Sequence, residues 1–145
     1  VLVKTINATV KNSTFRNVTS TGNLLSVETS WGESTGSRNI VISGVLFDNT
    51  GFDTSEDIKA PISISSLATY GNATVDTLRS SNILITGCEF KDYGHNFGIY
   101  VNGARDVRII NNVFDPEVGA EPDNFIKILT ALDILIEDNK YRKNV

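Results

Sequence analysis

A short pattern recurs five times along the chain, and no other feature of the sequence constrains the fold as strongly. Each copy has a polar Asn or Asp, an apolar-x-apolar strand, a turn residue and then an aromatic residue, with no helical periodicity between copies. Repetition on this scale indicates stacked structural units, none of which can bury its apolar face alone. The aromatic residues of the five copies are Phe15, Phe47, Phe90, Phe114 and Tyr141.

The positions within each copy predict where the side chains point. Seven and five residues before the aromatic, the sequence is aliphatic, and side chains that alternate along a strand place both positions inside together. Three residues before the aromatic stand only Asn, Gly or Asp, which tolerate a left-handed backbone at a bend. The bend positions are Asn12, Gly44, Gly87, Asn111 and Asp138, and the polar residues eight before the aromatic are Asn7, Asn39, Asn82, Asp106 and Asp133.

A second alternating segment follows the aromatic in four copies. Its apolar residues are Leu25 and Val27, Ile62 and Ile64, Ile99 and Val101, and Ile126 and Ile128. Two short strands per copy, with matching columns, predict an all-β chain wound as a right-handed parallel β-helix of about five coils. A β-sandwich is the alternative, because short strands at regular spacing also predict one.

Length and composition restrict the partners. The 145 residues predict a single domain, residues 1–145, and we expect it to be part of a longer solenoid because neither end has room for a polar cap. A net charge of -4 and a pI of about 4.9 argue against nucleic acid and anionic membranes. No apolar run is long enough for a membrane span, and no spacing predicts a metal site or a cofactor. We expect Cys88 to be a small buried residue rather than a nucleophile.

The outward positions of the second segment are mostly polar. One column reads Ser26, Ser63, Tyr100 and Lys127, and the next reads Glu28, Ser65, Asn102 and Leu129. Hydroxyl, amide and aromatic groups on one face suit a sugar, although any strand facing solvent is polar. We therefore expect a polysaccharide or glycan partner, with Trp31, Ser63, His95, Tyr100, Asn102 and Lys127 as substrate-binding residues.

The outward column of the first segment is instead largely aliphatic. It reads Thr9, Val41, Leu84, Arg108 and Leu135. An apolar outer stripe predicts a second domain or subunit against Val41, Leu84 and Leu135. The alternative is that the assumed register is wrong by one residue there.

Acidic residues in the loops are candidates for glycoside hydrolysis, which uses two carboxyl groups at defined separations. The candidate catalytic residues are Glu28, Glu33, Asp53 and Asp57. Of these, Glu28 and Glu33 flank Trp31, and the others follow Phe47. Groups one or two coils apart on one face fall in the required range of separation.

The chain resembles the parallel β-helix carbohydrate-active enzymes in its repeat form Asn-Ile-x-Ile-x-x-Asn-x-Phe. It is most similar to the β-helix portion of glycoside hydrolase family 110, in the stretches 24–33, 38–51, 60–65, 81–114 and 124–141. A weaker similarity to the polygalacturonases of glycoside hydrolase family 28 rests on Asn49-Thr50-Gly51, Gly94-His95-Asn96 and Ile126-Lys127. The paired aspartates and the arginine of that family's pattern are absent from this chain.

The resemblance implies an α-galactosidase-like glycoside hydrolase that acts by inversion and is secreted, periplasmic or at the cell surface. Two other classes stay open. One is a non-catalytic glycan-binding or structural β-helix module, such as a cell-surface or spike segment. The other is a polysaccharide lyase, in which Lys127 or His95 would abstract a proton.

Overall fold

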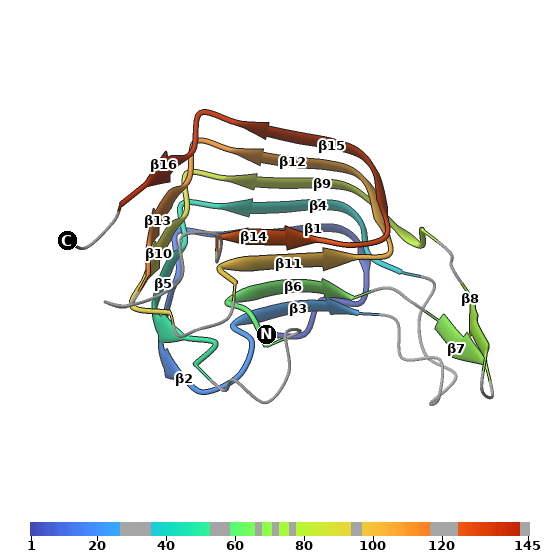
Figure 1. Ribbon diagram of the computed structural model, residues 1–145, viewed down its shortest axis with the longest axis horizontal. Helices are drawn as coiled ribbons and strands as arrows, with labels where there is room; N and C mark the ends of the chain where they lie inside the picture. The colour runs from blue at the N-terminus through green and yellow to red at the C-terminus, as the bar shows by residue number, and fades with distance from the viewer. Residues whose placement is uncertain are drawn as a thin grey trace.

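The fold is built from short β-strands in three parallel sheets (Figure 1). The computed structural model describes residues 1–26, 36–52, 59–65, 68–70, 73–75, 78–93, 97–116 and 125–142, with 68–70 and 73–75 described by their backbone only. Within these ranges there is no helix. The prediction of an all-β chain is confirmed.

Each sheet takes one strand from successive copies of the repeat. The first sheet contains β1 (Ile6–Lys11), β4 (Arg38–Ser43), β9 (Ser80–Thr86), β12 (Ala104–Ile110) and β15 (Ala131–Glu137). The second contains β2 (Thr14–Val18), β5 (Leu46–Thr50), β10 (Glu89–Lys91), β13 (Val113–Asp115) and β16 (Lys140–Tyr141). The third contains β3 (Asn23–Ser26), β6 (Ile62–Ser65), β11 (Ile99–Asn102) and β14 (Ile126–Ile128). We call the strands of one copy a rung.

The order of the strands is consistent with a parallel β-helix, because each rung pairs only with the rungs before and after it. Parallel pairing excludes the β-sandwich, whose sheets are antiparallel. The sequence predicts two strands per copy, and this count is wrong: the aromatic residue lies on a separate short strand. The bend three residues before the aromatic divides what reads as one segment into two strands.

One element does not belong to the stack. β7 (Ala68–Tyr70) and β8 (Ala73–Val75) form an antiparallel hairpin in the connection between β6 and β9. In Figure 1 this hairpin lies to one side of the three sheets.

Asn and Asp residues make the bends. The predicted column three before the aromatic has positive φ in all five copies, from 48° at Asn12 to 61° at Gly87. The column eight before the aromatic also has positive φ, from 53° to 62°. A third set of bends lies near the ends of second-sheet strands, at Asn17 in β2, at Asn49 in β5 and at Asp92 just after β10. Short polar side chains are the ones that adopt this backbone region at low cost.

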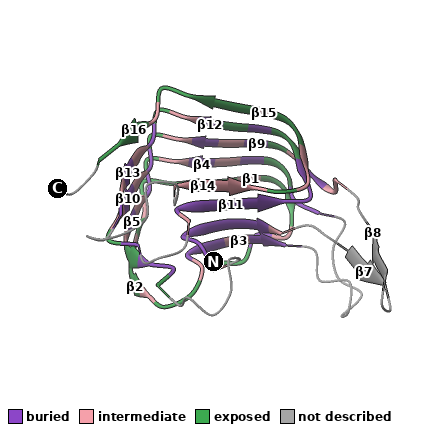
Figure 2. Ribbon diagram, in the orientation of Figure 1, coloured by how far each residue is buried: buried purple, intermediate pink, exposed green. Residues whose placement is uncertain are grey.

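The core is a stack of like residues from successive rungs. The aromatic rings lie nearly parallel, with centroids 5.4, 5.1, 4.7 and 5.5 Å apart from Phe15 to Tyr141. The aliphatic columns meet in the predicted register, for example Ile40 beside Ile83 and Ile42 beside Ile85. Figure 2 shows the middle rungs mostly buried and the β15–β16 end exposed.

The register of the third sheet differs from the prediction in the first copy. Asn23 pairs with Ile62 and Leu25 with Ile64, so Leu25 is the second inward residue and not the first, and Ser26 lies beside Ser65 instead of Ser63. A Cβ on Gly22 would come within 2.9 Å of the Phe47 ring. Glycine is therefore needed where the chain passes this ring. With this contact, the following strand aligns with β6 two residues earlier in the sequence than predicted.

The outer column of the first sheet has the predicted register. Thr9, Val41, Leu84, Arg108 and Leu135 lie beside one another on five strands. A register wrong by one residue is thus excluded. The domain or subunit expected on this stripe stays a prediction.

Candidate functional site

Six of the ten residues that the sequence nominates for a site lie outside the described residues. They are the four candidate carboxylates and two candidate binding residues: Glu28, Glu33, Asp53, Asp57, Trp31 and His95. The structure describes the other four and places all of them on the third sheet. These are Ser63, Tyr100, Asn102 and Lys127.

Tyr100 is the centre of this group. On β11 it lies in register between Ser63 of β6 and Lys127 of β14. The Nδ2 atom of Asn102 donates a hydrogen bond to the Tyr100 hydroxyl oxygen at 3.2 Å. The Nζ atom of Lys127 is 4.9 Å from the centre of the Phe97 ring, which is a cation–π distance. The structure therefore brings together the four described binding residues.

The middle of this face is buried. Only 7 % of Tyr100 and 8 % of Asn102 is exposed, and Ser63 is fully buried. The Oγ atom of Ser63 has no hydrogen-bond partner among the described residues. In this structure Tyr100 contributes packing and a hydrogen bond within the sheet, and its role as a sugar platform stays a prediction.

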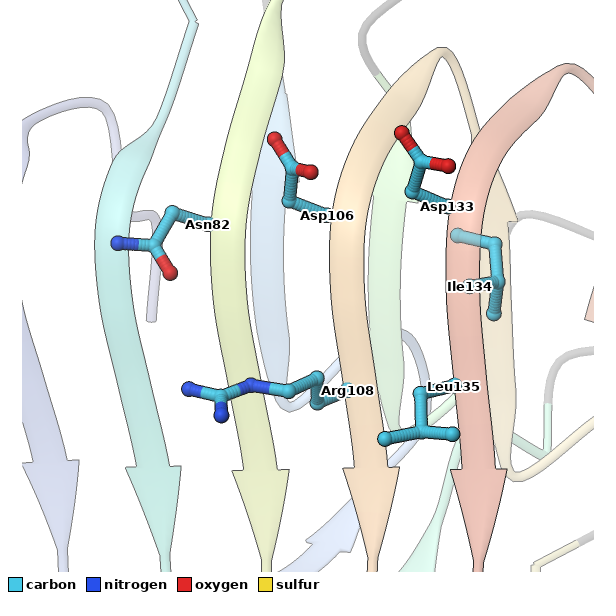
Figure 3. A pocket seen from close by; sticks show the side chains of 6 residues that line it. All are labelled: Asn82, Asp106, Arg108, Asp133, Ile134 and Leu135. Atoms are coloured by element: carbon cyan, nitrogen blue, oxygen red, sulfur yellow. The ribbon is translucent and has the colours of Figure 1, made fainter.

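A second polar group lies on the outer surface of the first sheet, around a shallow pocket of about 330 Å³ (Figure 3). Strands β9, β12 and β15 provide its lining, which combines carboxylate, amide, guanidinium and aliphatic groups. The lining residues are Asn82, Asp106, Arg108, Asp133, Ile134 and Leu135. We call this set the Asp106–Asp133 pocket.

The strand register places the two carboxylates side by side. Val107 pairs with Ile134 and Arg105 with Leu132, so the intervening Asp106 lies beside Asp133 on the next strand. Figure 3 shows the two carboxylates pointing the same way from adjacent strands. Adjacent strands are about 4.8 Å apart, which is close to the separation of roughly 5 to 5.5 Å in retaining glycosidases.

Hydrogen bonds link the same column in the rungs that precede this pair. Asn39 Nδ2 donates to Asn7 Oδ1 at 2.8 Å, and Asn82 Nδ2 donates to Asn39 Oδ1 at 2.9 Å. Each of these amides thus donates to the rung before it. Where Asp replaces Asn, the donor is lost, so the column has no side-chain donor at Asp106 or Asp133.

Basic and apolar groups complete the pocket. Figure 3 shows the Arg108 side chain extending across β9 and the Leu135 side chain lying between β12 and β15. Arg105 Nε is 3.9 Å from Asp106 Oδ2, and both side chains are more than half exposed, so this ion pair stabilises little. The pocket therefore offers acceptors, a donor and an apolar floor, which is what a sugar ring requires for binding.

The sequence contains a signal for this site in the column of polar residues eight before the aromatic. Asn7, Asn39 and Asn82 change to Asp106 and Asp133 in the last two rungs. Asn and Asp serve a positive-φ bend equally well, so the change from amide to carboxylate is not required by the backbone.

Cys88 is a structural residue, as expected. It is 1 % exposed and is a free thiol. Its Sγ lies 3.7 Å from the carbonyl oxygen of Ile42, and burial raises the pKa of the thiol to about 11. A protonated buried thiol is a poor nucleophile.

Comparison of the chain with family models, with curated proteins and with solved structures found no match. No group of three His, Cys, Asp or Glu side chains that could hold a metal ion occurs in the described ranges. Those ranges also contain no helix of the length and apolarity needed to cross a membrane.

Proposed function

We propose that this protein is a carbohydrate-processing, right-handed parallel β-helix that acts as a glycoside hydrolase. The observation that carries the proposal is the Asp106–Asp133 pocket, where two carboxylates from consecutive rungs lie side by side with a guanidinium and an aliphatic floor. Hydrolysis of a glycosidic bond uses two such carboxyl groups. The similarity to α-galactosidases suggests an α-galactoside as the substrate.

In this proposal the pair divides the two tasks of a retaining hydrolase. One carboxylate attacks the anomeric carbon, and the other carboxyl group protonates the leaving oxygen and then activates water. Arg108 donates hydrogen bonds to the bound sugar, and Leu135 packs against its apolar face. The spacing of adjacent rungs predicts retention of configuration, whereas the similarity to family 110 implies inversion.

Turnover on a panel of α-galactosides and uronans tests the proposal. We expect Asp106→Asn and Asp133→Asn each to reduce kcat/KM by at least about a hundredfold, since each removes one member of an acid/base pair. Asp92→Asn is the matched control, because it makes the same change at a positive-φ bend outside the pocket. The anomeric form of the first product, read by NMR, distinguishes retention from inversion.

The same assay tests the carboxylates that the sequence nominates. If turnover proceeds by inversion, and is abolished by Glu28→Gln but not by Asp106→Asn, the Asp106–Asp133 pocket is not the active site. If the wild type is inactive on every substrate, the hydrolase proposal fails for this chain.

One observation favours a second function, a non-catalytic glycan-binding module. Asp106 and Asp133 occupy bends where other rungs have Asn, so an Asp there has a structural role without any chemistry. For this function we expect binding on a glycan array without turnover. Arg108→Gln should weaken that binding at least tenfold, and Asp92→Asn should leave it unchanged.

A further inference from the structure

The second and third rungs present the same three groups on the outer face of the first sheet. Each strand offers an amide, an aliphatic side chain and a hydroxyl, in this order along the strand. These residues are Asn39, Val41 and Ser43 on β4, and Asn82, Leu84 and Thr86 on β9. We call these residues the interior strip, because both strands lie inside the sheet, between β1 and β12.

Strand register aligns the like groups of the two rungs. Val41 pairs with Leu84, and the two hydroxyl residues pair in the same way. The Nδ2 atom of Asn82 donates to Oδ1 of Asn39 at 2.9 Å, so the amides are held in fixed orientations. Like groups therefore repeat at the inter-strand distance of about 4.8 Å, which is close to the length of one sugar residue in an extended glycan.

The groups of the interior strip are accessible to a ligand. The two amides are exposed, and the aliphatic and hydroxyl residues are partly exposed. The hydroxyls of Ser43 and Thr86 have no hydrogen-bond partner among the described residues. In the ladder each amide donates only one of its two N–H groups. A sugar, which has hydroxyls on its rim and C–H groups on its faces, can use all three kinds of group.

The interior strip is continuous with the Asp106–Asp133 pocket. Asn82 belongs to both, because it lines the pocket and provides an amide of the strip. Leu84 pairs with Arg108 on the next strand. The Arg108 side chain extends across β9, so its guanidinium reaches the strip from the pocket (Figure 3). A ligand in the pocket can therefore continue onto the strip along the surface of one sheet.

The distribution of charge favours a neutral ligand. Neither residues 39–43 nor residues 82–86 include a charged side chain. In the pocket one guanidinium lies with two carboxylates, so the pocket has no excess of positive charge to attract an anion. The interior strip and the pocket together suit a neutral glycan better than a uronan.

The width of the aliphatic column favours a glycan over a protein. Val41 and Leu84 form a column one residue wide, with amides on one side and hydroxyls on the other. A protein interface usually has a broader apolar core surrounded by a polar rim. A single glycan chain needs only one such column, because its sugar rings follow one another in a line.

We propose that the interior strip provides two binding subsites for neutral sugar residues, next to the sugar whose bond is broken in the Asp106–Asp133 pocket. The substrate is then an extended neutral glycan that crosses β12, β9 and β4 in turn. Leu84 packs against the first sugar beyond the pocket, and Val41 packs against the second. This inference rests on the proposed function for the position of the reacting bond.

The dependence of turnover on substrate length tests the proposal. The probes are neutral α-galacto-oligosaccharides of two, three and four residues. We expect kcat/KM of the wild type to rise at least about tenfold from the disaccharide to the tetrasaccharide, because the two added sugars contact the strip. Leu84→Ala should remove most of this gain. A matching series of uronide oligosaccharides should show no gain.

Leu46→Ala is the matched control, since Leu46 is a partly exposed leucine of the second rung that lies on the second sheet. It should keep the full gain. A wild type that hydrolyses the disaccharide but gains nothing from length overturns the inference and leaves the proposed function standing. An equal gain for uronides contradicts the neutral class of substrate. If Leu84→Ala changes the molar mass in light scattering instead of the gain, the strip is a contact between copies and the inference fails.

Binding measured by NMR separates this inference from the hydrolase itself. The probe is the tetrasaccharide, titrated into isotope-labelled Asp106→Asn protein so that the ligand stays intact. We expect the backbone amides of Val41, Leu84 and Thr86 to shift. If these amides shift although the wild type is inactive, the hydrolase proposal fails and the sugar subsites stand. The absence of shifts on β4 and β9 overturns the inference whether or not the wild type is active.

Discussion

At the scale of single residues, the bends depend on a narrow choice of side chains. Every non-glycine residue with positive φ in the described ranges is Asn or Asp. These residues share one backbone conformation but differ in hydrogen bonding, because Asn has both a donor and an acceptor while ionised Asp only accepts. The same bend can therefore either link rungs through an amide ladder or present a carboxylate.

Asp106→Asn should stabilise the fold. The new Nδ2 can donate to Asn82 Oδ1, which extends the existing ladder by one bond and removes a facing carboxylate. We expect the free energy of unfolding in urea to rise by about 0.5 to 1.5 kcal/mol. Asp138→Asn is the control. Asn111, the residue of the same column on the preceding rung, belongs to no side-chain ladder in the described structure, so the expected change is near zero. A destabilised Asp106→Asn variant would show that the ladder does not continue.

Cys88 predicts how stability depends on pH. Burial raises the pKa of the Cys88 thiol from its ordinary value of 9.0 to about 11, so the folded state holds its proton where the unfolded chain has lost it. The thiol contribution is fully present below pH 9 and is lost as pH rises from 9 to 11. The loss amounts to about 2 to 3 kcal/mol, at 1.36 kcal/mol per pKa unit.

Urea unfolding from pH 8 to pH 11 measures this loss. Cys88→Ser should flatten the decline in that window, since a serine hydroxyl does not titrate there and can still donate to the Ile42 carbonyl. Tyr93 also contributes to the decline above pH 10, because burial raises the pKa of its hydroxyl. An equally steep decline in Cys88→Ser would assign the whole effect to other groups.

At the scale of elements, the stacked aromatic strands set the position of the strands that follow them. Gly22 and Gly98 each lie just before a strand of the third sheet and each contact an aromatic ring. A Cβ on Gly98 would come within 2.9 Å of the Phe114 ring. Gly98 does not have a positive φ, so its backbone conformation does not require glycine. Glycine is needed here for the close approach to the ring.

Gly98→Ala should therefore destabilise the protein through overpacking. We expect a loss of about 1 to 3 kcal/mol in urea unfolding. Gly87→Asn is the contrasting variant: it has φ of 61° but open space around its Cβ, and Asn occupies the same column in other rungs. Its change should stay within roughly 0.5 kcal/mol. Equal losses in the two variants would contradict a steric role for Gly98.

These contacts also explain which parts of the fold the sequence can predict. The columns of the first sheet follow from alternation along a strand, and they are confirmed residue by residue. The first copy of the third sheet was misaligned because its register depends on Gly22 meeting Phe47, a contact between segments far apart in the sequence. Periodicity carries no information about such a contact.

The candidate site was less predictable for a related reason. Ser63, Tyr100, Asn102 and Lys127 do lie together, since they follow from strand register. Their burial does not follow from alternation, which predicts only that they point outward. The Asp106–Asp133 pocket was missed because Asn and Asp were grouped as one polar column of the repeat, and the change from amide to carboxylate is evident only when successive rungs are compared.

At the scale of the whole molecule, stability should decrease toward the ends. Interior rungs have neighbours on both sides, whereas β15 and β16 have neighbours on one side only. In such a stack stability is close to a sum of terms between neighbouring units, so terminal units open first.

Hydrogen exchange measures this gradient. We expect amides of β9 and β4 to exchange at least about a hundredfold more slowly than those of β15 and β16 at low protein concentration, because end opening costs less free energy than global unfolding. Uniform exchange along the stack would mean that the five rungs unfold as one unit.

The matching columns of successive rungs have a consequence for how such a molecule can change over evolutionary time. A segment of DNA that encodes one rung can be duplicated or deleted, and the flanking rungs still meet partners with the same columns. Each event would lengthen or shorten the stack by about 4.8 Å and leave its cross-section unchanged. The stack can therefore change its length by whole rungs, while the side chains on each rung vary independently.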